Sequence, residues 1–138
     1  MPPAPTRESI LQFIRFLSVG VANTLVGLSI IYAAKWFLAA GDVVANASGY
    51  AVGLIVSFTL NSRWTFSYTG PRRAAALKFL GVAAVAYGMN LLTVITAIEM
   101  FRINAYVAQA LGVPSYTLTS FLLSKYFVFQ APAPLGTR

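Results

Sequence analysis

The sequence predicts an all-α membrane protein with four transmembrane helices, built as two parallel repeats of a helical hairpin. Three observations predict this fold. Of the 138 residues, 58% are hydrophobic and only 9% are charged, whereas a soluble domain carries about a quarter charged residues. The apolar residues form four blocks long enough to cross a bilayer. The two halves of the chain also match each other at one constant offset.

The four spans are expected at about 15–36, 44–66, 78–98 and 105–129. Before the first span, apolar residues recur at helical spacing, which predicts an interfacial lead-in helix. The apolar run 16–34 has 19 residues, more than the about 7–15 of a signal-peptide core, so we expect a retained helix. Pro114 should kink or break the fourth helix.

The whole chain, 1–138, is expected to form a single membrane domain. Its parts are a first repeat at about 13–66, a cytoplasmic loop at about 67–77, a second repeat at about 78–129 and a C-terminal tail at 130–138.

The distribution of positive charge predicts the orientation in the membrane. Lys35 and Arg102 lie on one side of the predicted spans together with Asp42 and Glu99. The other eight basic residues flank the opposite side: Arg7, Arg15, Arg63, Arg72, Arg73, Lys78, Lys125 and Arg138. Because cytoplasmic segments carry the excess of Lys and Arg, both termini and the central loop should be cytoplasmic.

The internal match has an offset of 63 residues and needs no gap between 15–66 and 78–129. Gly49 falls on Gly112 and Phe58 falls on Phe121. Duplication of a two-helix unit is the simplest account. Since each unit contains an even number of spans, the two copies share one orientation.

Small and polar residues within the spans indicate how the helices pack. Gly49, Gly53, Ser57 and Asn61 recur every fourth residue, a stripe that lets a neighbouring helix approach closely. Their equivalents are Gly112, Tyr116, Ser120 and Ser124. Asn23 and Asn90 lie inside apolar spans, where an unsatisfied amide is costly, so each must face a helix, water or a ligand.

Several classes of function are disfavoured by residue content. The chain has no cysteine and no histidine, so we expect no disulfide, no metal site and no histidine-based catalysis. Neither paired carboxylates nor a phosphate-binding Gly-rich loop is present, so we expect no cofactor and no enzyme activity. The excess of 10 basic over 3 acidic residues is explained by topology, and we expect no nucleic-acid partner.

A family resemblance rests on a set of short motifs. They are Arg15-Phe16, Val19-Gly20, Asn23-Thr24, Gly49-Tyr50, the segment 61–66 (Asn-Ser-Arg-Trp-Thr-Phe) and its echo 124–129. With these motifs the chain resembles the GtrA-like family over nearly its whole length. The second half departs from the family pattern, because Ser124, Lys125 and Phe127 stand where the family often has Asn, Arg and Trp. The departure leaves the general function intact, and the sequence does not determine whether the two halves play equal roles.

The resemblance implies a small protein of the bacterial cytoplasmic (inner) membrane that acts in cell-surface polysaccharide synthesis or modification. It implies flipping of a polyprenyl-phosphate-linked monosaccharide from the cytoplasmic to the outer leaflet. A four-helix bundle is too narrow for a sugar, so we expect either a lateral groove or a dimer or larger homo-oligomer in contact with membrane lipids. One alternative is a non-catalytic membrane partner that recruits or anchors a glycosyltransferase.

A small multidrug-type proton exchanger is a further alternative. It needs a carboxylate deep in the membrane, whereas Glu8, Asp42 and Glu99 all lie at or beyond the predicted helix ends. This alternative is therefore disfavoured.

Candidate residues for the lipid phosphate and headgroup fall into two groups. The first is a cationic ring near the cytoplasmic helix ends, formed by Arg15, Arg63, Lys78 and Lys125. Arg63 is the leading candidate, because a guanidinium can bond two phosphate oxygens at once. The alternative is that these cations only anchor the topology.

The second group could contact the sugar: Asn23, Asn61, Asn90 and Trp64. Each has a structural alternative, which is interhelical hydrogen bonding for Asn23 and Asn90, helix capping for Asn61 and an interfacial aromatic belt for Trp64.

Overall fold

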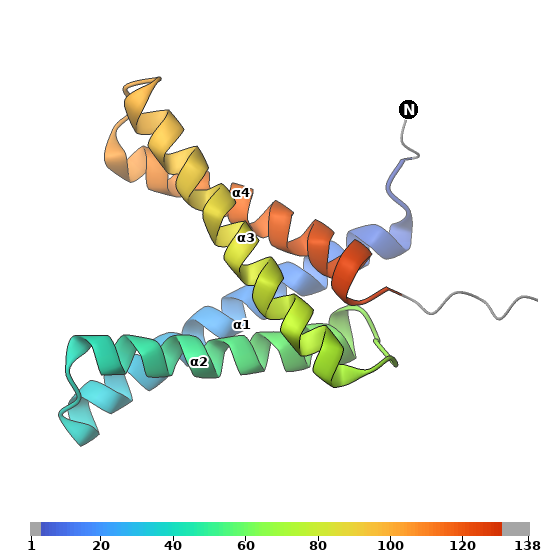
Figure 1. Cartoon of the computed structure of the whole chain (residues 1–138), viewed down its shortest axis with the longest axis horizontal. Coiled ribbons are helices and arrows are strands. Elements are labelled where there is room, and N and C mark those ends of the chain that lie inside the picture. The colour runs from blue at the N-terminus through green and yellow to red at the C-terminus, as the bar shows by residue number, and fades with distance from the viewer. Residues whose placement is uncertain (1–3, 131–138) are drawn as a thin grey trace, which may run out of the picture. The chain divides into compact units, whose positions relative to one another are not determined.

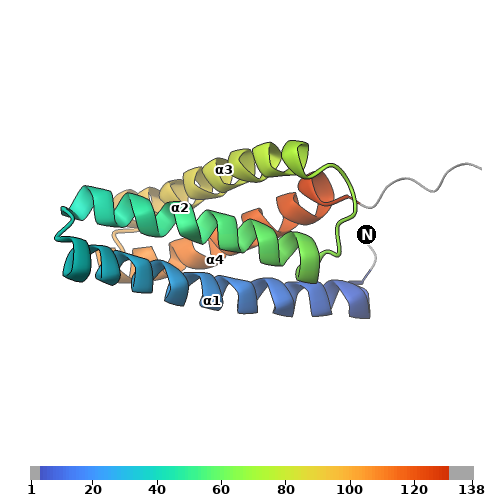
Figure 2. The same ribbon diagram turned by 90° about the horizontal axis from the view of Figure 1, so that it is seen from below.

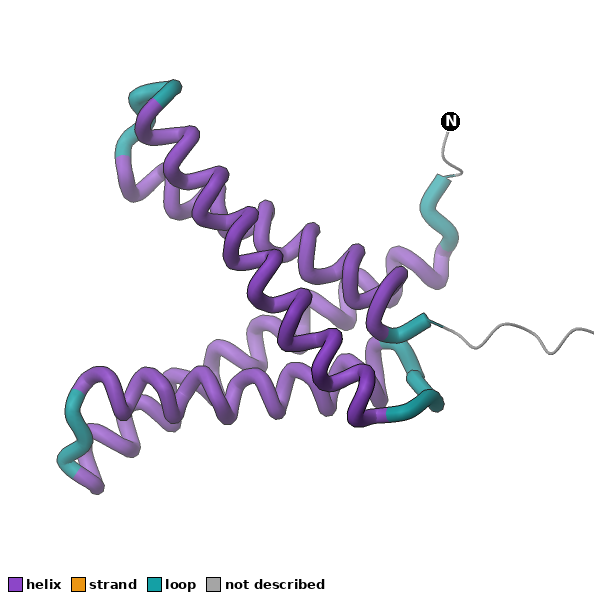
Figure 3. The backbone as a smooth tube through the Cα atoms, in the orientation of Figure 1, coloured by secondary structure: helices purple, strands orange, loops and turns teal. Residues whose placement is uncertain are grey.

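A computed structural model describes residues 4–130, and every secondary-structure element in this part of the chain is a helix (Figures 1 and 3). The elements are α1 (Arg7–Leu38), α2 (Asp42–Leu60), η1 (Asn61–Thr65), α3 (Arg72–Glu99), α4 (Ala105–Leu123) and η2 (Ser124–Val128). The two short η elements are π-helical turns that continue α2 and α4. Most of the predicted C-terminal tail, 131–138, lies outside the described residues, as do residues 1–3.

The contacts divide the chain into two compact units between Ser67 and Tyr68. In the first unit α1 packs antiparallel against α2 and η1, and we call this pair hairpin 1. In the second unit α3 packs in the same way against α4 and η2, and we call this pair hairpin 2 (Figures 1 and 2).

Helix α1 begins earlier than predicted and is continuous. The Oγ1 atom of Thr6 accepts a hydrogen bond of 3.2 Å from the Ser9 amide and caps the first turn. The residues of the predicted lead-in helix are helical and form the first turns of α1 itself, without a break before the predicted first span. At the other end Ala39 adopts a left-handed conformation (φ 49°) and reverses the chain, and Lys35 and Asp42 form an ion pair across this turn.

Hairpin 2 starts at Arg72, also before the predicted start at Lys78, so the loop between the hairpins is shorter than predicted. Its turn ends at Asn104, whose Oδ1 accepts a hydrogen bond of 2.8 Å from the Tyr106 amide and caps α4. Helix α4 continues through Pro114. The sequence predicts a kink or a break at that proline, and the helix does not break there.

The exposure of side chains is the reverse of that in a soluble protein. Buried positions on α2 are small residues, Ala45, Gly49 and Gly53, whereas large apolar side chains point outward. Trp36 is 84% exposed and Tyr50 is 72% exposed. Small residues between the helices and bulky apolar residues on the outside are typical of helices that face lipid.

Within residues 4–130, three helical segments are long and apolar enough to cross a membrane: Arg7–Leu38, Asp42–Thr65 and Arg72–Glu99. Helix α4 is not among them. It is more polar because it carries Gln109, Ser115, Thr117 and Thr119 along with Pro114.

The helices of each hairpin approach closely at glycines of the predicted stripe. A Cβ atom at Gly49 would lie 2.8 Å from the Gly27 carbonyl oxygen and 2.5 Å from Cγ1 of Ile31. In hairpin 2 a Cβ atom at Gly112 would lie 2.9 Å from Cγ2 of Val94. Only a residue without a side chain fits at these positions, so the predicted close approach at the stripe is confirmed.

Candidate functional site

At the end of hairpin 1 that leads into the loop between the two hairpins, a guanidinium lies beside an indole ring. Nη1 of Arg15, on α1, donates a hydrogen bond of 3.2 Å to the carbonyl oxygen of Trp64, on η1. The guanidinium carbon lies 5.6 Å from the centroid of the Trp64 ring, within the range of a cation–π contact. One donor of Arg15 is thus held by the backbone while the others have no hydrogen-bond partner among residues 4–130.

Trp64 belongs to the π-helical turn η1. Wide π turns are rare and are often found at functional sites. Here the turn is stabilised by the amide of Asn61, which is 1% exposed. Its Oδ1 accepts a hydrogen bond of 2.8 Å from Thr65 Oγ1, and its Nδ2 donates one of 3.2 Å to Ser57 Oγ. The side chain of Asn61, a predicted headgroup ligand, is therefore hydrogen-bonded to residues of α2 and η1.

Beside Arg15 lies a cavity of about 480 Å³, which we call the polar pocket. Its lining residues come from α1 and from the end of the second helix: Arg7, Glu8, Leu11, Gln12, Arg15, Thr65, Phe66 and Ser67. Glu8, Gln12 and Arg15 are spaced by four and three residues, so they share one face of α1. The pocket therefore combines basic, acidic and amide side chains.

Gln12, one of the residues that line this pocket, has an unsatisfied acceptor. Its Oε1 atom is buried and has no hydrogen-bond partner within the described part of the chain. A buried polar atom without a partner is costly, and each such atom calls for an explanation. Neither Gln12 nor Glu8 is among the candidates predicted from the sequence. The available signal was the polar face of the first turns of α1, opposite the apolar residues that suggested a lead-in helix.

Arg63, the leading candidate from the sequence, lies on η1 with its side chain exposed. It is next to Trp64 in the chain but does not line the polar pocket. The structure therefore brings Arg15 and Trp64 together with Gln12 and leaves Arg63 at the surface of the same helix end.

The matching end of hairpin 2 holds the other two predicted cations. Nζ of Lys78 lies 5.2 Å from the centroid of the Phe127 ring. Nζ of Lys125 lies 5.5 Å from the ring of Tyr126 and 6.0 Å from that of Phe121. Both lysines thus contact aromatic faces on η2 or the end of α4.

Two of the positions that lie 63 residues after polar residues of the pocket are apolar in hairpin 2. Ala75 stands 63 residues after Gln12, and Val128 stands 63 residues after Thr65; both are buried. An equivalent of the Gln12 amide is therefore missing at this end.

The two intramembrane asparagines lie between the helices of their hairpins. Oδ1 of Asn23 would be 2.8 Å from a Cβ atom at Gly53, and Nδ2 of Asn90 would be 2.6 Å from one at Gly112. Asn23 Oδ1 is buried and unpaired among the described residues. Each amide thus packs against a glycine of the facing helix, but the unpaired Oδ1 of Asn23 does not make the hydrogen bond of the interhelical alternative.

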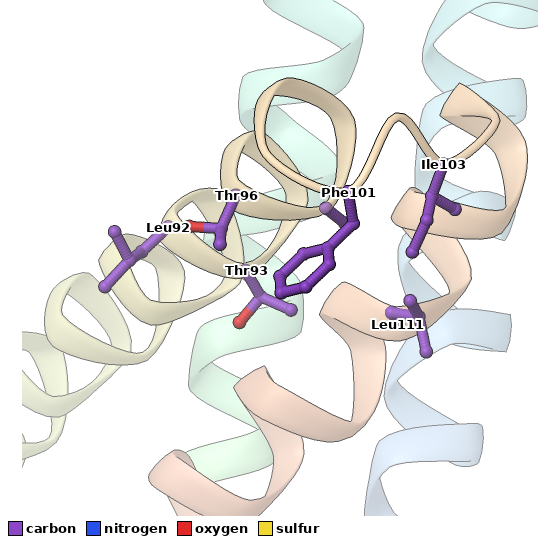
Figure 4. Close-up of a pocket in the computed structure, with 7 residues that line it drawn as sticks. Leu92, Thr93, Thr96, Phe101, Ile103 and Leu111 are labelled. Atoms are coloured by element: carbon purple, nitrogen blue, oxygen red, sulfur yellow. The ribbon is translucent and has the colours of Figure 1, made fainter.

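A second cavity, of about 510 Å³, lies at the opposite end of hairpin 2. Figure 4 shows Leu92, Thr93 and Thr96 on α3, Leu111 on α4 and Phe101 and Ile103 on the turn between them. Ala97 completes the lining. Because no charged side chain lines this cavity, it does not suit a phosphate.

Helices with small residues between them, bulky apolar residues outside and cations at their ends define a helical membrane protein. The chain belongs to the family described as the GtrA/DPMS transmembrane domain, whose model matches residues 15–129. It is therefore a multi-pass membrane protein. The match begins at Arg15 and ends at Phe129, so it spans both hairpins.

Two curated proteins are similar to this chain. The bactoprenol-linked glucose translocase of Shigella phage SfV is 26% identical over 125 residues, covering 86% of this chain and 94% of the phage protein. The bactoprenol-linked glucose translocase of Shigella phage SfII has the same identity and coverage.

Proposed function

We propose that this protein translocates a polyprenyl-phosphate-linked sugar across the membrane, with the phosphate bound by Arg15 in the polar pocket. It acts as a transporter and not as an enzyme. The observation that carries the proposal is the geometry of Arg15, whose guanidinium is held by the Trp64 carbonyl and still lines a pocket open to a ligand. The similarity to the two phage glucose translocases supports the class of substrate.

The charge of the pocket fits a lipid phosphate. Arg7 and Arg15 contribute two positive charges, and Glu8 contributes one negative charge. Hydrogen bonds from a guanidinium to a phosphate are charge-assisted and stronger than neutral ones. A site at the end of the hairpin leaves the polyprenyl chain in the bilayer beside the exposed apolar side chains of α1.

We further propose that the two hairpins are copies of one unit and that all four helices cross the membrane. Helices α2 and α4 begin and end 63 residues apart, and so do η1 and η2. Equivalent ring pairs also recur, with centroids 6.4 Å apart for Phe16 and Phe66 and 6.1 Å apart for Phe79 and Phe129. These correspondences support a parallel repeat.

In this proposal the protein resides in the bacterial inner membrane with both termini in the cytoplasm. The polar pocket then opens to the cytoplasmic leaflet, where a lipid-linked sugar would be loaded. Arg63, exposed at the same helix end, attracts the phosphate, and Lys78 and Lys125 are part of the positive charge of the cytoplasmic helix ends. The sugar crosses along a lateral groove or between protomers of a homo-oligomer.

Reconstitution of the purified protein tests this proposal. Vesicles containing the wild-type chain should flip a fluorescent polyprenyl-phosphate glucose between leaflets, and Arg15→Ala should slow flipping at least tenfold. Arg72→Ala serves as the matched control, because Arg72 is exposed at the start of α3. Wild-type vesicles without flipping, in the presence of correctly folded protein, would contradict transport and favour recruitment of a glycosyltransferase.

A further inference from the structure

We infer that Glu8 and Gln12 recognise hydroxyl groups of the sugar, so that the polar pocket distinguishes a sugar-bearing lipid phosphate from a bare one. The inference rests on the proposed function and adds the part of the substrate that the first turns of α1 bind. It starts from the acceptors in the pocket, which a phosphate-only site does not need.

The pocket contains two kinds of groups with opposite preferences. Arg15 is a pure donor and suits phosphate oxygens, whereas the Glu8 carboxylate is a pure acceptor and repels them. The unpaired Oε1 atom of Gln12 is an acceptor as well. Sugar hydroxyls are the donors in a lipid-linked monosaccharide, so the acceptors match the sugar and the guanidinium matches the phosphate.

The positions of these groups fit a headgroup laid along α1. Glu8, Gln12 and Arg15 follow one another on one face of the helix, and a rise of about 1.5 Å per residue separates Glu8 from Arg15 by roughly 10 Å. A phosphate at Arg15 therefore places the attached sugar beside Gln12 and toward Glu8. The cavity of about 480 Å³ lies within the range of about 300–1,000 Å³ that holds small ligands.

Hairpin 2 provides an internal contrast. The residue that corresponds to Gln12 is Ala75, which is 1% exposed, and the one that corresponds to Glu8 is Pro71. Neither side chain accepts a hydrogen bond. If the acceptors served only to complete a helix end, hairpin 2 would need them as well, yet α3 and η2 form without them.

Ligand binding to the full-length protein in detergent tests this inference. The probes are the methyl ester of farnesyl phosphate, below simply called farnesyl phosphate, and farnesyl phosphoglucose. Both are phosphodiesters with one negative charge, and they differ only in carrying a methyl group or glucose. Trp64, beside Arg15, reports binding by its fluorescence, in a Trp36→Phe background that removes the second tryptophan. We expect the wild-type pocket to bind the glucose-bearing probe more tightly than farnesyl phosphate.

The Gln12→Met variant keeps the size of the side chain and removes the acceptor. It should lower affinity for farnesyl phosphoglucose by roughly three- to tenfold, the value of one neutral hydrogen bond, and leave farnesyl phosphate unchanged. Gln109→Met, on an exposed position of α4, is the matched control and should alter neither affinity. An equal loss for both probes in Gln12→Met would overturn the inference and indicate a structural role.

The Glu8→Ala variant gives effects of opposite sign. Removing the carboxylate should increase the affinity for farnesyl phosphate, because a repulsive charge is lost. It should also reduce the preference for the glucose-bearing probe. A uniform tightening of both probes would show that Glu8 contributes only charge and would overturn its part in sugar recognition.

The same experiment separates this inference from the proposed function. Wild-type protein that binds both probes equally would overturn sugar recognition and leave the phosphate site standing. Wild-type protein that binds neither probe would overturn the phosphate site in the polar pocket and with it the inference.

Discussion

At the end of hairpin 1 the guanidinium of Arg15 lies 5.6 Å from the ring of Trp64, and at the matching end of hairpin 2 the ammonium of Lys78 lies 5.2 Å from the ring of Phe127. The backbone is alike at the two ends, since each second helix finishes in a π-helical turn. The surroundings differ. Gln12 borders a polar pocket in hairpin 1, whereas Ala75, 63 residues later in the chain, is buried in hairpin 2.

This difference separates packing from binding. Features present in both hairpins, namely the glycine contacts, the phenylalanine pairs and the π-turns, account for how two helices pack side by side in lipid. Features present in hairpin 1 alone are polar and line a cavity, so they are the ones that we assign to a ligand. Substitutions at each feature distinguish those that both hairpins share from those of hairpin 1 alone.

The largest effect is expected at the shared glycines. Gly49→Leu and Gly112→Leu should each destabilise the protein by about 3 kcal/mol, because the new side chain would collide with the facing helix. Thermal unfolding in detergent measures the loss. Gly20→Leu and Gly88→Leu are the controls, since both glycines face open space, and a similar loss in these controls would refute the assignment.

The next effect concerns the unequal cations. Arg15→Ala should weaken binding of a polyprenyl-phosphate sugar by about 1.5–3 kcal/mol, because hydrogen bonds to a charged ligand are lost. Arg15→Lys keeps the charge but not the forked guanidinium, so its affinity should lie between those of the wild type and Arg15→Ala. Equilibrium binding in detergent measures both.

Lys78→Ala is the comparison for Arg15→Ala and should change affinity by less than about 1 kcal/mol, since its side chain is exposed and its charge is screened. Equal losses for Arg15→Ala and Lys78→Ala would mean that the two hairpins share the phosphate, contrary to the asymmetric site.

A smaller effect is expected from exchanging the residues at the two π-turns. Thr65→Val removes the donor to Oδ1 of buried Asn61 and should destabilise the protein by about 1–2 kcal/mol. In hairpin 2 the buried Oγ of Ser124 has no partner among residues 4–130. Val128→Thr supplies one a turn later and should stabilise the protein by up to about 1 kcal/mol.

Chemical denaturation in detergent measures both changes at the π-turns. Thr24→Val is the control, because the hydroxyl of exposed Thr24 bonds only the backbone of its own helix. Changes of the same sign for Thr65→Val and Val128→Thr would show that the two turns do not differ in the way described.

The smallest effect is expected at Arg63. Because its side chain is exposed and lies outside the lining of the polar pocket, Arg63→Ala should reduce transport a few-fold, and the reduction should shrink as salt is raised. Flipping assays at low and high salt measure this. A salt-independent loss as large as that of Arg15→Ala would place the phosphate at Arg63 instead.

Much of the fold follows from the sequence alone. The long apolar blocks with basic ends require helices in lipid, because only a helix satisfies its own backbone in a bilayer. The repeated glycines at Gly49 and Gly112 predicted the close approach of the paired helices, since small residues at a spacing of four leave room for a neighbour. The starts of α1 at Arg7 and of α3 at Arg72 could not be predicted, because a short stretch of mixed polar and apolar residues before a span is compatible with helices of several lengths.

The candidate site was decided by tertiary structure. The sequence marks Arg63 as the leading candidate in a cationic ring that also contains Arg15. Only the packing of α1 on η1 places Arg15 against Trp64 and leaves Arg63 exposed. The pocket beside Gln12 joins residues more than fifty positions apart in the chain. Composition and periodicity report the environment of a single helix, whereas a binding site depends on which side chains two helices bring within a few ångströms of each other.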